Sequence, residues 1–107
     1  MALRNWPLAS VPANTVTDLV VPAASSAVAI VGLIVCNTDA TDAADVTITL
    51  TDAAGTILST VLLATLDPRE SLHLDTRVVL AASATPEKLR VLATLAGVSV
   101  TASGSEG

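Results

Sequence analysis

The sequence predicts an all-β protein, a single antiparallel β-sandwich or jelly-roll-like domain of about seven or eight short strands with an extended N-terminal arm. The chain has 107 residues, enough for one core and one domain. Hydrophobic residues make up 51% of it but only one residue is aromatic, so the core must be built from aliphatic side chains that suit a thin sandwich. Short segments of alternating apolar and polar residues recur about every 8–12 residues, a spacing typical of sandwiches and barrels.

Residues 1–13 are predicted to form the arm, because Pro7 and Pro12 forbid a continuous helix there and disfavour a central strand. The sandwich itself is expected over residues 14–104, followed by a flexible tail at residues 105–107. The chain is therefore expected to hold one domain between two terminal extensions.

Two strands are predicted in the first third of the chain, at residues 15–21 and 27–36. Because residues 27–36 are apolar throughout, we expect a central strand that is covered on both faces. Gly32 inside this run predicts a β-bulge or a close approach of two backbones. The run of ten residues is about half as long as a membrane-spanning helix requires.

A β-hairpin is predicted in the middle of the chain. In residues 46–51, Val, Ile and Leu alternate with Thr, so one face should pack into the core and the Thr face should meet water or a neighbouring copy. A turn at residues 52–55 and a strand at residues 56–63 complete the hairpin. Residues 38–45 carry three of the ten acidic residues and are predicted to be a solvated loop.

The remaining strands are predicted at residues 71–75, 88–94 and 98–103, with turns between them. A helix over residues 81–95 is the alternative, since Ala and Leu are good helix formers. Within residues 88–94, Leu89, Val91 and Ala93 alternate with Lys88, Arg90 and Leu92, which favours the strand.

Charge argues against two classes of partner. The formal net charge of −5 has the wrong sign for nucleic acid, which requires a basic surface, and the five basic residues do not cluster. The same reason disfavours an anionic membrane, so neither partner is expected. Cys36 is the single cysteine and cannot form an internal disulfide, which fits a reducing compartment.

Few residues can carry out catalysis, and we expect no catalytic, cofactor-binding or metal-binding residue. His73 and Asp75 share a strand face, but a general base needs an orienting partner and a nucleophile, and a closed zinc site needs four ligands. Exposed strand residues are the favoured interpretation. Cys36 has no basic neighbour in the sequence and is expected to be a buried small side chain. The aspartates of residues 38–45 lack the alternating ligand positions of a calcium loop.

Trp6 is the single aromatic residue and lies in the predicted arm. Because Trp frequently anchors protein–protein interfaces, one interpretation is that the arm docks Trp6 into a neighbouring subunit or partner. The candidate interface residues are then Leu3, Arg4, Trp6 and Leu8. The other interpretation is that this segment folds back on its own sheet and Trp6 closes one end of the sandwich.

Three segments give the chain a recognisable order of strands and turns. Residues 17–58 contain an IVCN strand end and the VTITLTDAAG hairpin, residues 66–82 contain PRESLHL, and residues 88–106 end in AGVSVTASGSE. This order resembles that of small β-sandwich virion proteins of tailed bacteriophages, which occur as head decoration (cement), tail, neck or fibre components. The resemblance covers about residues 15–106 and includes no catalytic motif.

The resemblance implies a structural protein of the virion and not an enzyme. Since the chain has no stalk or receptor-binding extension, a capsid decoration protein that stabilises the head shell through repeated subunit contacts fits best. Its partners would be the major capsid protein or other virion proteins and further copies of itself, with a trimer favoured at capsid three-fold positions. It would be assembled in the host cytoplasm and lie at the capsid surface. The alternatives are a tail, baseplate or neck structural protein and a small carbohydrate-binding, adhesin-like module.

Overall fold

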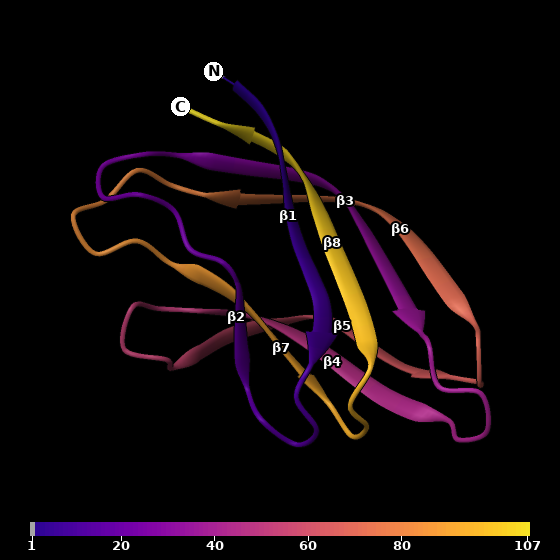
Figure 1. Cartoon of the computed structure of the whole chain (residues 1–107). Coiled ribbons are helices and arrows are strands. Elements are labelled where there is room, and N and C mark those ends of the chain that lie inside the picture. Colours follow the sequence, from indigo (N-terminus) through magenta and orange to yellow (C-terminus); the bar gives the residue numbers. More distant parts are fainter. Residues whose placement is uncertain (1) are drawn as a thin grey trace.

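The computed structural model describes residues 2–107 and confirms the all-β prediction, since eight strands form two antiparallel sheets that pack face to face (Figure 1). Sheet A contains, in spatial order, β1 (Ala2–Val11), β8 (Val98–Glu106), β3 (Val28–Asn37) and β6 (Ser71–Leu80). Sheet B contains β2 (Thr17–Val20), β7 (Lys88–Ala93), β4 (Ala44–Thr51) and β5 (Ile57–Leu66). Strand β7 lies where a helix was the alternative prediction. Within residues 2–107, no helix is long and apolar enough to cross a membrane.

The hydrophobic core lies between the two sheets and, apart from Trp6, is built from aliphatic side chains, as the composition predicted. The largest of the fully buried side chains are those of Ile30, Leu33, Ile48, Leu80 and Leu89. Burying one such side chain contributes about 1.5–3 kcal/mol to the free energy of unfolding. The outward Thr residues at the centre of β4 stay partly exposed, which confirms the two-faced pattern predicted for that strand.

Strand β3 lies between β8 and β6, which confirms that it is a central strand. The prediction that it is covered on both faces is wrong, because a sandwich of two sheets covers only the inner face of each. Val31 and Ile34 point outward and are 57% and 44% exposed. The register of β3 against both neighbours shifts between Ile30 and Gly32, which confirms the predicted bulge.

The N-terminal segment is a strand of the sandwich. Residues 2–11 form β1 at the edge of sheet A and pair with β8, beginning with Ala2 opposite Glu106. The prediction of an arm outside the sheets is therefore wrong for these residues, while Met1 lies outside the described residues. Pro7 is tolerated because an edge strand has one side without ladder hydrogen bonds.

The predicted flexible tail at residues 105–107 is also part of the sandwich. Strand β8 continues to Glu106. The backbone N–H of Gly107 donates to the carbonyl oxygen of Ala27, and the N–H of Ala27 donates back, both at 3.0 Å. The two ends of the chain consequently lie side by side (Figure 1).

The predicted turn at residues 52–55 joins β4 and β5. Oδ1 of Asp52 accepts hydrogen bonds from the backbone N–H groups of Ala54 at 3.0 Å and Thr56 at 2.9 Å. Gly55 has a φ of 98°, a left-handed conformation that glycine adopts without a steric penalty. Turn chemistry and backbone geometry therefore agree, and the hairpin prediction is confirmed.

Asn37, at the end of β3, is a fully buried polar side chain that joins three segments. Its Nδ2 donates to the carbonyl oxygens of Asp42 at 2.9 Å and Leu66 at 3.2 Å, and its Oδ1 accepts from the N–H of Asp39 at 3.1 Å. Because buried polar groups need partners, these bonds fix the loop between β3 and β4 and the end of β5 against β3.

Gly104 lies where β8 passes between β1 and β3, opposite Arg4 on one side and Ile30 on the other. A Cβ atom built at this position would lie 1.9 Å from the carbonyl oxygen of Ala29. Only glycine therefore permits this approach of β8 to β3.

We expect the Gly104→Ala substitution to lower the free energy of unfolding by about 3 kcal/mol, because the clashing atoms belong to the backbone and cannot rotate away. Gly32→Ala is the matched control, since a Cβ there meets no heavy atom within 4 Å. It should change stability by less than about 1 kcal/mol. Urea unfolding measures both values, and equal stability of the two variants would contradict the close approach.

Candidate functional site

The outer face of sheet A, the side turned away from sheet B, is the candidate functional surface. Besides Val31 and Ile34, it exposes Leu3 to 91% and Val79 to 59%. Cross-strand partners share a face, and Ala29 pairs with both Val79 and Ser105, while Ser105 pairs with Leu3. Leu3 and Val79 therefore belong to one row of outward side chains that crosses all four strands.

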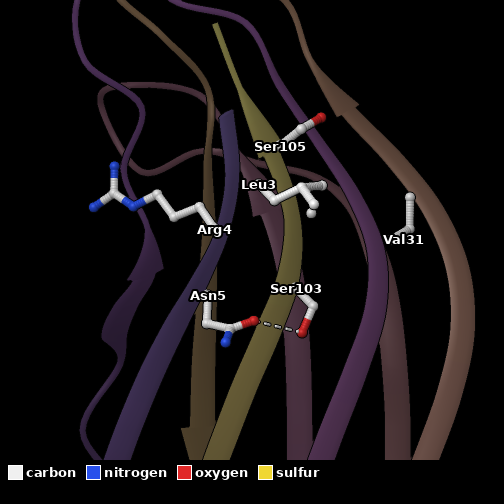
Figure 2. Close-up of a pocket in the computed structure, with 7 residues that line it drawn as sticks. Leu3, Arg4, Asn5, Val31, Ser103 and Ser105 are labelled. Carbon is white, nitrogen blue, oxygen red and sulfur yellow. Dashed lines mark hydrogen bonds between the residues drawn. The ribbon is translucent and has the colours of Figure 1, made fainter. Parts of the chain in front are cut away.

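A shallow hollow of about 460 Å³ lies on this face, over β1, β8 and β3. Figure 2 shows Leu3, Val31 and Ser105 around its upper part and a hydrogen bond below them, in which Oγ of Ser103 donates to Oδ1 of Asn5 at 3.0 Å. Aliphatic, hydroxyl and amide side chains line the hollow together with Arg4, so its lining is partly apolar and partly polar.

The outward side chains of β1, β8 and β3 are uncharged, as far as residues 2–107 are described. Only the edge strand β6 adds charge, with Asp75 and Arg77 of opposite sign. The opposite face of the molecule differs, because Asp18 pairs there with Arg90 at 2.8 Å and with Lys88 at 3.8 Å. The protein therefore has one neutral face and one face with ion pairs.

The predicted interface residues of the N-terminal segment divide into two groups. Trp6 is only 6% exposed and belongs to the core, and Leu8 packs partly buried against that core. The interpretation that Trp6 docks into a partner is therefore wrong, and the alternative, in which the segment folds on its own sheet, is correct. Leu3 and Arg4 remain at the surface.

Arg4 and Glu106 form an ion pair at the end of the sandwich, on the inner side of β1. The guanidinium of Arg4 lies 5.1 Å from the centre of the Trp6 ring, and in Figure 2 it points away from Leu3 and Val31. Oε2 of Glu106 also accepts the backbone N–H of Ala23 at 3.2 Å. The bond from Ala23 and the ion pair with Arg4 lower the pKa of Glu106 below its ordinary value of 4.5.

The residues considered for catalysis or metal binding, His73, Asp75 and Cys36, lie on the same outer face without forming a site. His73 and Asp75 share the exposed side of β6, opposite Ile34 and Gly32, as their spacing predicted. Cys36 is partly exposed, whereas the sequence predicted a buried side chain, because it too points outward from β3.

The predicted acidic loop is shorter than residues 38–45, because β4 already begins at Ala44. Within this loop, the carboxylate of Asp39 makes internal hydrogen bonds. Oδ1 of Asp39 accepts the N–H groups of Thr41 at 2.8 Å and Asp42 at 2.9 Å, and these bonds lower the pKa of Asp39. Within the described part of the chain, no group of three or more His, Cys, Asp or Glu residues is placed to hold a metal ion.

No protein-family model matches the chain, and no curated protein matches it. The resemblance to phage virion proteins therefore rests on the order of strands and turns in the sequence.

We expect Trp6→Ala to lower the free energy of unfolding by about 3–5 kcal/mol, because it leaves a cavity in the core. Trp6→Phe should cost less, since it keeps a ring and Nε1 of Trp6 has no hydrogen-bond partner among the described residues. Denaturant unfolding followed by far-ultraviolet circular dichroism measures both. A Trp6→Ala variant as stable as the wild type would contradict a core position for Trp6.

Stability should fall in acid partly through Glu106. Its pKa is lower in the folded than in the unfolded chain, so its contribution is present above pH 4.5 and is lost as the pH falls through the folded value. Glu106→Gln should therefore lose less stability than the wild type below pH 4.5, with Asp39 accounting for part of the remaining loss. Urea unfolding between pH 7 and about pH 3 tests this, and identical pH dependence in both proteins would refute it.

Proposed function

We propose that the protein is a structural protein of a tailed-bacteriophage virion, a capsid decoration protein that stabilises the head shell through repeated subunit contacts. The neutral outer face of sheet A carries this proposal. A surface whose charges offset one another and which exposes several aliphatic side chains is suited to packing against another protein surface. The order of strands and turns that resembles phage virion proteins supports the same role.

A structural role also fits the distribution of chemical groups. A general base requires an orienting partner and an enclosed position next to its substrate. His73 and Asp75 instead lie exposed on an edge strand of an open sheet face. We therefore assign the protein a role in assembly and no catalytic one.

The burial of Trp6 bears on the alternatives. Carbohydrate-binding modules stack sugar rings on exposed aromatic side chains, and the single aromatic ring of this chain lies in the core. The adhesin-like alternative is thereby disfavoured. A tail, baseplate or neck protein would use the same neutral face and is distinguished by its binding partner.

The proposal is tested by mixing the purified protein with expanded, undecorated capsids of the phage that encodes it and pelleting the shells. We expect binding to saturate at a fixed copy number per shell, because a decoration protein occupies equivalent lattice positions. Saturated shells should also resist heat better than bare ones. Shells that already carry the protein are the control and should bind no more. Protein that stays in the supernatant, or pellets without saturation, would refute a decoration role.

A further inference from the structure

We propose that the outer face of sheet A is covered by the same face of a second copy of this chain, in a dimer with two-fold symmetry. This inference rests on the proposed function, because it concerns the same outer face of sheet A and identifies a second copy of the chain as its partner. It is tested on the free protein, so that either conclusion can fail without the other.

The first argument is the exposed apolar area. Leu3, Val31, Ile34 and Val79 are all at least 44% exposed and come from three strands of one sheet. An antiparallel sheet with a solvated outer face normally turns polar side chains toward water. Exposed aliphatic groups on a small protein make a sheet face a candidate for cover by another molecule. Sheet B also exposes aliphatic side chains, including Ile57 and Leu63, so charge has to distinguish the two faces.

The second argument is charge. Each chain carries a formal net charge of −5, so two copies repel each other unless the approaching surfaces are neutral. The outward side chains of β1, β8 and β3 are uncharged, and Asp75 and Arg77 on β6 offset one another. The outer face of sheet B carries Asp18, Lys88 and Arg90 and does not meet this condition.

The third argument is self-complementarity of the polar groups. The outward residues of β8 form a column of hydroxyl side chains, Ser99, Thr101, Ser103 and Ser105. A hydroxyl group both donates and accepts hydrogen bonds, so it can pair with an identical group across a two-fold axis. A column of carboxylates or ammonium groups would require a partner of opposite charge.

The fourth argument is size. Four strands about 4.8 Å apart, each about ten residues long, give a face of roughly 600 Å² per copy. Two such faces bury about 1,200 Å², the lower limit for stable protein–protein interfaces. The hollow of about 460 Å³ beside Leu3 and Val31 provides space for aliphatic side chains of the opposing sheet.

The test is the molar mass in solution, measured by light scattering and sedimentation equilibrium over a range of concentrations. We expect twice the chain mass of 10.7 kDa. Val31→Asp and Ile34→Asp should each weaken association by about tenfold or more, because they bury a carboxylate opposite its own copy. Leu63→Asp is the matched control, since Leu63 is an exposed aliphatic residue of sheet B and its variant should still dimerise. Thermal unfolding confirms that all variants are folded.

Cys36 provides a second measurement, because it is the single cysteine and points outward from β3. Alkylation of its thiol should be slower in the wild-type dimer than in the Val31→Asp variant. A wild-type monomer at all concentrations, equal alkylation rates, or dissociation by Leu63→Asp but not by Val31→Asp would overturn the proposal. A trimer, which the phage resemblance implies, would overturn the two-fold arrangement.

The outcomes also separate this inference from the proposed function. A monomer that binds capsids, and loses that binding with Val31→Asp, would assign the face to the shell protein and overturn the dimer. A dimer that ignores capsids would leave the interface intact and refute the decoration role.

Discussion

The position of β8 between β1 and β3 is the constraint on which sheet A depends. It makes the last strand of the chain a central strand and holds the first strand at the edge. Trp6 reaches the core only because its strand is paired with β8, opposite Ala102. The same pairing brings Arg4 to Glu106. On the other side of β8, the close backbone approach to Ala29 of β3 is possible only because residue 104 is glycine. Since the pairing of β1 with β8 joins residues about a hundred positions apart, it depends on non-local contacts, which are associated with slow folding.

This arrangement also determines the character of the outer face. Strand β8 turns Val and Ala inward and Ser and Thr outward, so it packs the core without adding charge to the surface. On either side of it, β1 and β3 turn Leu3, Val31 and Ile34 outward. The hydroxyl groups keep this face soluble enough for a free chain, while the aliphatic groups provide the area for contact. Hydrogen bonding and apolar contact are therefore available on the same surface.

Local patterns in the sequence predicted the strands whose alternation is regular, including the two-faced β4, β7 and the turn before β5, and Gly32 marked the bulge in β3. They did not predict β1, because Pro7 interrupts the pattern and the strand pairs with residues at the other end of the chain. They also predicted that both faces of β3 are covered. An apolar run shows that a strand is hydrophobic, but it does not show whether other elements cover one or both of its faces. The sequence did contain a signal that β3 has an uncovered face. In β8, Ser and Thr alternate with apolar residues, which indicates a strand with one solvent-facing side, and β3 lies beside β8 in the same sheet.

The weakness of charge on this face has a consequence for assembly. Association that depends on apolar contact and hydroxyl groups gains little from electrostatic steering and is little affected by salt. A single contact of this size is modest in strength, but contacts repeated over a symmetric lattice reinforce one another through effective concentration. Most of the acidic residues lie in loops and turns, and the net negative charge that they give the chain favours solubility. If the proposed dimer decorates a shell, its binding strength there comes from the geometry of the array.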